Sequence, residues 1–170
     1  MNTSALHKIS YGLYIIGGSD GQRQNAQVAN SVVQVCSEPP VVSVCLNKQN
    51  YTHELVKSGK AFSVAVLAQD TPLRFIGNFG FKSGRDTDKL AGVKQLKGVT
   101  GAPVVTENAV AYLEAEVISE TDVHTHTIFV GKLVAAEVLS EGEPMTYAYY
   151  HQVKRGTTPK SAPSYVAEAE

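Results

Sequence analysis

The sequence is poor in cysteine and carries almost no net charge, and each shortage excludes a class of protein. Its 170 residues contain only two cysteines, Cys36 and Cys45, too few for a site in which four thiolates hold iron or zinc. The 15 lysines and arginines are balanced by 16 aspartates and glutamates, which gives a formal net charge of −1. We therefore expect no nucleic-acid or anionic-membrane partner, because no strong field would attract one.

Long apolar runs are also missing. None reaches the roughly 20 residues that a membrane-spanning helix requires. Residues 1–8 are too polar to form the apolar centre of a signal peptide. We therefore expect a cytoplasmic protein, whose two thiols lie in apolar strand-like stretches and are free and buried.

The apolar content that is present suits one globular domain. Hydrophobic residues make up 43% of the chain and charged residues 18%, a composition typical of a folded core rather than of disorder. A stretch rich in proline and serine begins at Thr157, and such a composition favours an extended chain. The sequence thus predicts one domain over residues 1–156 and an extended arm or linker over residues 157–170.

Strands dominate the predicted secondary structure. Short apolar or alternating stretches predict strands at residues 9–16, 32–37, 41–46, 61–67, 110–118 and 126–138. Glycines within residues 17–21 predict a turn after the first strand. Helices are predicted at residues 50–58, ended by Gly59, and from Thr71-Pro72 toward residue 79, with one more turn at 86–91. Many short strands with a few inserted helices predict a mainly β fold, a closed barrel with helical excursions.

Two polar stretches interrupt the strands and are candidates for a binding site. Residues 25–31 are mostly small or polar, and they suit either the polar edge of a ligand or a hairpin edge that faces water. Lys48, Asn50 and Thr52 stand where the predicted helix begins, and the free amides of a helix N-terminus attract phosphate. These residues equally suit an ordinary helix cap with a surface lysine.

A basic loop is the next candidate. Ser83, Arg85 and Lys89 surround a flexible glycine, an arrangement that suits a phosphate or a nicotinamide nucleotide. The alternative is that Arg85 pairs with Asp86 or Asp88 on the surface.

His124 and His126 lie two residues apart, which places both on one face of a strand at a spacing that suits a metal. Only Asp122 stands near enough in sequence to join them, so we predict no metal site, and a histidine-based metalloenzyme is the weaker alternative. The glycine spacings of Rossmann and P-loop sites are missing from the sequence.

Seven motifs follow one another along the chain. They are Gly12-x-Tyr14, residues 25–31, residues 38–54, residues 79–89, residues 101–104, residues 126–131 and residues 149–151. Each motif is weak alone, but their order over residues 8–165 resembles the flavin reductase family, in particular its flavoredoxin-like branch. Residues 153–165 are similar to the segment that leads into a rubredoxin module in some relatives, although the paired cysteines of that module are missing from this sequence.

The resemblance implies a split β-barrel of Greek-key topology that forms a homodimer and binds one FMN per subunit near the interface. It implies that the isoalloxazine edge, the ribityl chain and the phosphate are held by Asn25, Val28, Ala29, Asn30, Ser31, Asn47, Lys48, Asn50, Thr52, Ser83, Arg85 and Lys89. His126 matches the family histidine that lies close to the ring, and it is the predicted catalytic residue. Members that reduce free flavin often have Gly-Asp before this histidine, where this chain has His124-Thr125.

These features together predict an NAD(P)H:flavin oxidoreductase. Its FMN would take a hydride from NAD(P)H and pass electrons to a flavin or to a protein acceptor. Two alternatives stay open: an FMN electron carrier reduced by a rubredoxin or an iron–sulfur protein, and a flavin-binding protein without redox function.

Overall fold

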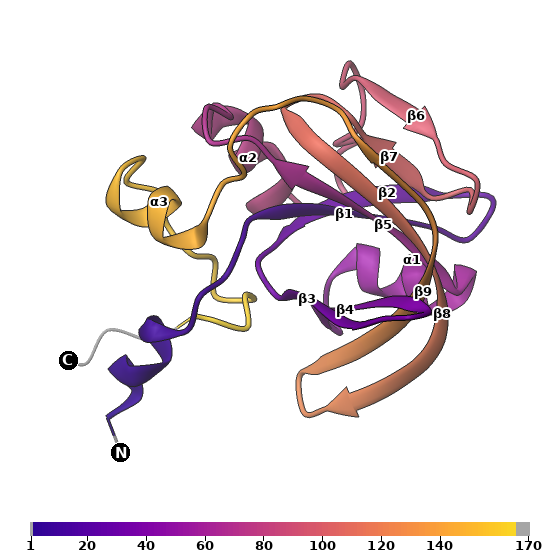
Figure 1. The fold of residues 1–170 in the computed structure, drawn as a ribbon, viewed down its shortest axis with the longest axis horizontal. Helices are drawn as coiled ribbons and strands as arrows, with labels where there is room; N and C mark the ends of the chain where they lie inside the picture. Colours follow the sequence, from indigo (N-terminus) through magenta and orange to yellow (C-terminus); the bar gives the residue numbers. More distant parts are fainter. Residues whose placement is uncertain (1, 166–170) are drawn as a thin grey trace.

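Strands make up most of the structure, a computed structural model that describes residues 2–165 (Figure 1). The strands are β1 (Tyr14–Ser19), β2 (Gln24–Ala29), β3 (Val32–Ser37), β4 (Pro40–Asn47), β5 (Ala61–Leu67), β6 (Gln95–Lys97), β7 (Pro103–Val105), β8 (Ala109–Val123) and β9 (His126–Val138). The helices are η1 (Thr3–Lys8), α1 (Tyr51–Gly59), α2 (Leu73–Gly80) and α3 (Tyr147–Gln152). The last part of the predicted arm, residues 166–170, lies outside the described residues. Within residues 2–165, no helix has the length and apolar character needed to cross a membrane.

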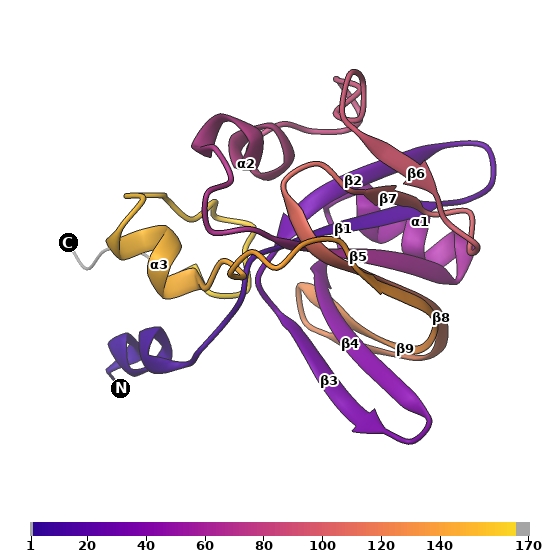
Figure 2. The same ribbon diagram turned by 45° about the horizontal axis from the view of Figure 1, so that its top comes forward.

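Seven strands form one antiparallel sheet in the order β2-β1-β5-β8-β9-β4-β3. β2 and β3 are its two edges, yet only Asn30 and Ser31 join them along the chain. A flat sheet of seven strands would be about 29 Å wide, whereas a two-residue link spans at most about 11 Å. The sheet must therefore curl until its edges meet, and Figures 1 and 2 show this curled sheet. The result is the mainly β split barrel that the sequence predicted.

The two faces of the sheet build two apolar clusters, because successive side chains of a strand point to opposite faces. Ile16 belongs to an inner cluster with Val64, Phe62 and Phe129. Its neighbour Ile15 belongs to an outer cluster, which also contains Leu67 from β5, Ile76 and Phe79 from α2 and Tyr150 from α3. The outer cluster thereby fixes α2 and α3 beside β1.

Three predicted strands, at residues 32–37, 61–67 and 126–138, match β3, β5 and β9 residue for residue. β8 extends beyond the predicted end at residue 118, because it pairs first with β5 and then along its whole length with β9. Residues 86–91 form turns and no helix, and α2 begins at Leu73, after an extended Pro72. The β6–β7 hairpin and α3 were not predicted.

The first predicted strand and its turn were placed too early in the chain. β1 runs from Tyr14 to Ser19, so the glycines expected to turn the chain lie within the strand. A Cβ on Gly17 would lie 2.2 Å from the carbonyl oxygen of Pro103. A glycine is required at this position because β7 lies so close to β1. The turn that follows β1 lies at residues 20–23.

Both cysteines are free, as predicted, but they are not buried. Cys36 is exposed and Cys45 is half-buried. The prediction failed because β3 is an edge strand that pairs only with β4, which leaves the outer face of β3 open to solvent.

Gly59 was predicted to end the helix, but its role is to let another backbone segment come close. The left-handed residue is Lys60, at φ 55°, and α1 includes Gly59 as its last residue. A Cβ on Gly59 would lie 1.8 Å from the carbonyl oxygen of Ser19, so the glycine allows α1 to pack on the end of β1.

We predict that Gly59→Ala lowers the free energy of unfolding by about 1–3 kcal/mol, because neither backbone can yield easily at this contact. Urea unfolding followed by circular dichroism measures the change. Gly77→Ala is the matched control, since a Cβ at Gly77 in α2 meets nothing within 4 Å; alanine should be neutral or stabilising there by up to about 1 kcal/mol. Equal effects of the two substitutions would contradict this packing role.

Candidate functional site

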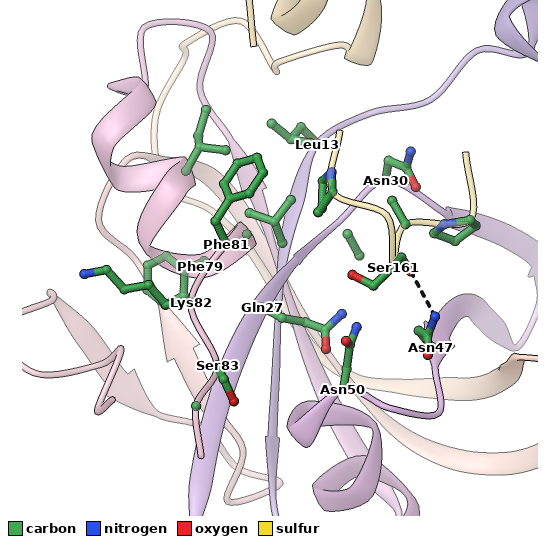
Figure 3. A pocket seen from close by; sticks show the side chains of 18 of the residues that line it. Leu13, Gln27, Asn30, Asn47, Asn50, Phe79, Phe81, Lys82, Ser83 and Ser161 are labelled. Atoms are coloured by element: carbon green, nitrogen blue, oxygen red, sulfur yellow. Dashed lines mark hydrogen bonds between the residues drawn. The ribbon is translucent and has the colours of Figure 1, made fainter. Parts of the chain in front are cut away.

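A cavity of about 360 Å³ lies where the two edges of the sheet meet (Figure 3). Its walls come from β2, the end of β4, the start of α1, α2 with the loop after it, and the segment that follows α3. The closure of the barrel determines this position. The Cys45 amide on β4 donates to the carbonyl of Ser31, 3.1 Å away, which extends the β3–β4 pairing into the link between the two edges. Pockets for small-molecule cofactors have volumes of about 300–1,000 Å³.

The structure brings most of the predicted cofactor-binding residues to this cavity. Those that line it are Asn25, Val28, Ala29, Asn30, Asn47, Asn50, Ser83 and Lys89. Lys48 and His126 instead line an adjacent hollow, to which Asn47 also contributes. Ser31, Thr52 and Arg85 line neither.

Lys89 is the buried cation of the cavity. It is only 4% exposed, and its ammonium group donates to the carbonyl oxygen of Phe79 at 3.3 Å. No ion pair to Lys89 occurs within residues 2–165. Burial lowers the pKa of Lys89 to about 8, because the charged form is poorly solvated there. A cation held in this way lacks an anion that a ligand phosphate would supply.

Gln27 adds an acceptor that the sequence analysis missed. Its side-chain oxygen Oε1 is buried and has no hydrogen-bond partner among the described residues. Figure 3 shows the Gln27 side chain in the cavity beside Asn50. An unsatisfied buried acceptor is unfavourable by about 1–3 kcal/mol, which a hydroxyl or ring N–H of a ligand would relieve. The signal was present, since Gln27 lies two residues from Asn25 and so on the same face of β2.

Asn25 lines the cavity, whereas Thr52 lies behind the wall and supports it. The Asn25 amide donates to the Thr52 hydroxyl at 2.8 Å, and Thr52 is wholly buried. This bond joins β2 to the first turn of α1. Thr52 thus positions Asn25, and its predicted direct contact with a cofactor remains a prediction.

Arg85 lies at the rim of the cavity on the surface. Its guanidinium pairs with Glu54 at 2.6 Å, and neither Asp86 nor Asp88 is its partner in the described structure. The same guanidinium lies 4.9 Å from the centre of the Tyr51 ring, which lines the cavity. Arg85 therefore fixes the position of α1 relative to the loop at residues 83–85.

Lys48 is also paired. Its ammonium lies 3.2 Å from one oxygen of Asp122, while the other oxygen accepts a hydrogen bond from Thr127 at 2.6 Å. The bonds from Thr127 and Lys48 lower the pKa of Asp122. Three cations were predicted near the start of α1 and in the basic loop: Lys48, Arg85 and Lys89. Of these three, only Lys89 has no ion-pair partner among the described residues, and it is the one that lines the cavity.

His126 has one ring nitrogen in use and one without a partner. Nδ1 lies 2.8 Å from the Thr125 hydroxyl, whereas Nε2 is buried with no hydrogen-bond partner among the described residues. Burial lowers the pKa of His126, which the backbone of Ser161 opposes. The imidazole is therefore neutral at pH 7. Within residues 2–165 no three His, Cys, Asp or Glu side chains form a group that could hold a metal ion.

The donor set fits a polar cofactor that carries one anionic group. Lys89 is a cation without an anion, Gln27 offers a free acceptor, and Asn30, Asn47 and Asn50 bring amides to the same cavity. A mainly β split barrel with such a cavity where its two edge strands meet is typical of proteins that bind a cofactor with an anionic group.

Comparison with known proteins agrees with this class. The model of the flavin reductase like domain matches residues 6–158. The chain is 52% identical over 170 residues to a high molecular weight rubredoxin from Moorella thermoacetica, covering 100% of this chain and 74% of the relative. It is 50% identical over 165 residues to a ferric-chelate reductase (NAD(P)H) from Archaeoglobus fulgidus, covering 97% of this chain and 98% of the relative.

Solved structures show the same fold. The NADH:FAD oxidoreductase of Streptomyces globisporus superimposes with a TM-score of 0.76 at 25% identity, over 84% of this chain and 83% of the other. The flavoredoxin of Methanosarcina acetivorans gives a TM-score of 0.71 at 25% identity, over 79% and 74% of the two chains. The chain belongs to the flavin reductase family and is an oxidoreductase of that class, as the sequence motifs predicted.

We predict that affinity for FMN, used as a probe, falls as the pH rises through about 8. Lys89 then loses its proton, whereas a bound phosphate would raise the pKa of the ammonium. Between the two pKa values the Kd should climb by up to about tenfold per pH unit. Fluorescence titration from pH 6.5 to 9.5 measures it.

The substitution Lys89→Gln should weaken binding at pH 7 and flatten this pH profile. Lys97→Gln removes the same charge from an exposed position on β6 and should keep the profile of the unmodified protein. If the Kd for FMN depends on pH in Lys89→Gln as it does in the unmodified protein, Lys89 does not bind the phosphate.

Proposed function

We propose that the protein is an FMN-dependent NAD(P)H oxidoreductase that passes electrons to a flavin or to a protein acceptor. The observation that carries this function is the cavity at the barrel seam, where the buried cation Lys89 lacks an anion and Gln27 lacks a donor. Membership of the flavin reductase family supports a flavin. One buried cation in the cavity favours a mononucleotide, with a single phosphate, over a dinucleotide.

Each wall of the cavity has a separate part in holding this cofactor. Lys89 and Ser83 would bind the phosphate, since both line the side formed by α2 and its following loop. Gln27 and Asn50, which face each other in Figure 3, would bind hydroxyl and ring edges. Asn47 lines both the cavity and the hollow that contains His126, so this end of the cavity is where the reacting edge of the ring would lie.

When bound, the flavin supplies hydride acceptance and electron release. The chain supplies position and environment. The apolar cluster under β1 and α2 excludes water from the inner wall. His126, neutral at pH 7, offers an unpartnered nitrogen that can make one hydrogen bond beside the ring, and it gains a positive charge only if it takes up a proton.

The NAD(P)H donor is proposed because the Archaeoglobus relative is a ferric-chelate reductase (NAD(P)H). A second function has its own support, because the Moorella relative, which this chain matches over its full length, is named a high molecular weight rubredoxin. In that version the FMN would exchange electrons with a rubredoxin-like partner.

The purified protein should be yellow, and anaerobic NADH or NADPH should bleach its flavin absorbance. Adding ferric citrate, free FMN or oxidised rubredoxin to the reduced protein then identifies the acceptor by the rate at which the colour returns. Bleaching by reduced rubredoxin, with none by NAD(P)H, would select the electron carrier. A colourless protein that binds no FMN, or a yellow one that no donor bleaches, contradicts both versions.

The substitution His126→Ala should slow reduction by about tenfold, equivalent to ~1.4 kcal/mol in the barrier, while FMN affinity changes much less. Stopped-flow absorbance gives the rate and fluorescence titration gives the affinity. His124→Asn is the control, since His124 stands in the adjacent turn at φ 47°, a conformation that asparagine tolerates. Loss of affinity with an unchanged rate would make His126 a binding residue.

We further propose a homodimer formed through β3. Val33 and Val35 are 61% and 54% exposed on this strand, whose outer edge is unpaired within the described residues. Exposed apolar edge strands are normally covered by another chain or element. β3 begins directly after the Asn30–Ser31 link, so a partner subunit there would lie beside the cavity.

Light scattering after size exclusion should therefore give twice the 18.2 kDa mass of the chain. The double substitution Val33→Glu with Val35→Glu should yield monomers, because two charges would be buried in the contact. Val99→Glu is the control, as Val99 is 76% exposed beyond β6. A monomeric unmodified protein would contradict the dimer.

A further inference from the structure

The segment after α3 forms part of the cavity wall. Thr157, Pro159 and residues 161–163 line the cavity, and Lys160 with residues 161–163 lines the adjacent hollow. Residues 161–163 thus separate the two spaces. We call residues 157–164 the strap.

A series of side-chain hydrogen bonds fastens the strap to both sides of the cavity. Nδ1 of His151 lies 2.8 Å from the Gly156 carbonyl, which only accepts, so Nδ1 donates and Nε2 accepts from the Thr158 hydroxyl at 3.1 Å. Thr158 also bonds the Tyr147 hydroxyl. Tyr147 in turn accepts from Ser164 at 3.1 Å, and Ser164 accepts from the Asn30 amide at 2.5 Å. The series therefore runs from α3 through the strap to the link between β2 and β3.

Two further bonds hold the strap near its middle and its start. The Asn47 amide donates to the Ser161 carbonyl at 3.2 Å, a bond drawn in Figure 3. The Tyr150 hydroxyl donates to the Thr157 carbonyl at 2.9 Å. The strap is thus bound to α3 on one side and to β4 and the β2–β3 link on the other.

We propose that the strap retains the bound flavin, with Tyr147 and Ser164 as the latch that keeps it closed; this inference rests on the proposed FMN function. The cavity keeps a volume of about 360 Å³ with the strap in place, so the strap acts as a wall over a ligand rather than as a plug. Because the strap is bonded on both sides, the flavin leaves only after these bonds open. The flavin then behaves as a resident cofactor that exchanges slowly.

The dissociation rate of FMN tests the latch. FMN-loaded protein is mixed with an excess of apoflavodoxin as a trap, and the flavin signal is followed in a stopped-flow instrument. Ser164→Ala and Tyr147→Phe should each raise the dissociation rate by about two- to tenfold for each net hydrogen bond lost, and each of these hydroxyls makes two bonds in the series. Ser164 lines neither space, so its effect must act through the strap.

Two controls separate the latch from a general loss of structure. Tyr149→Phe alters the same helix at a hydroxyl with no hydrogen bond in the described structure, and its rate should match that of the unmodified protein. The double variant Tyr147→Phe with Ser164→Ala should release FMN more slowly than the product of the two single effects predicts, because both substitutions remove the Ser164–Tyr147 bond. Unchanged rates in both single variants, or a gain confined to the association rate, would overturn the retaining role.

Trypsin cleavage of the unmodified protein gives a second test that needs no variant. Lys160 is exposed in the middle of the strap, and saturating FMN should slow cleavage after it by severalfold. Equal cleavage with and without bound FMN overturns the strap while leaving FMN binding established. Failure of the unmodified protein to bind FMN is a different result, and it would overturn the proposed function itself.

Discussion

Asn30 and Ser31 connect the two edge strands of a seven-stranded sheet, and this short connection forces the sheet to curl until its edges meet. The curl brings the polar face of β2 against the end of β4 and the start of α1. A cavity lined by amides therefore forms at the seam, where no strand ladder between β2 and β3 closes the barrel in the described residues. The rest of the site depends on this meeting of edges.

The groups at the seam differ in how completely the protein satisfies them. Asn25 is bonded to Thr52, Arg85 to Glu54 and Lys48 to Asp122, so these residues hold walls together. In the described structure Lys89 has no anionic partner, and the side-chain oxygen of Gln27 has no hydrogen-bond donor. The contrast separates residues that shape the cavity from residues that await a ligand, a distinction that residue type alone does not give.

Much of the fold could be predicted from the sequence, since β3, β5 and β9 are short apolar or alternating runs between clear turns. Gly17 and Gly59 were misread because the backbone that approaches each one comes from a distant part of the chain. The cavity residues were found through polar interruptions and through the family motifs. The sequence analysis did not predict that residues 157–164 pack on the domain. Their composition predicts an extended chain, but it does not reveal which hydroxyl and amide groups elsewhere in the chain bind this segment.

The buried ammonium of Lys89 has a consequence for how the protein matures. In the folded chain its pKa is about 8, below the ordinary value of 10.5, so burial of Lys89 destabilises the ligand-free fold at neutral pH, and this contribution disappears as the pH rises from about 8 through 10.5. An anion seated beside it would reverse this penalty. Binding of the cofactor would then stabilise the fold, and the ligand-free chain would be more vulnerable to unfolding and proteolysis while the cellular supply of flavin is low.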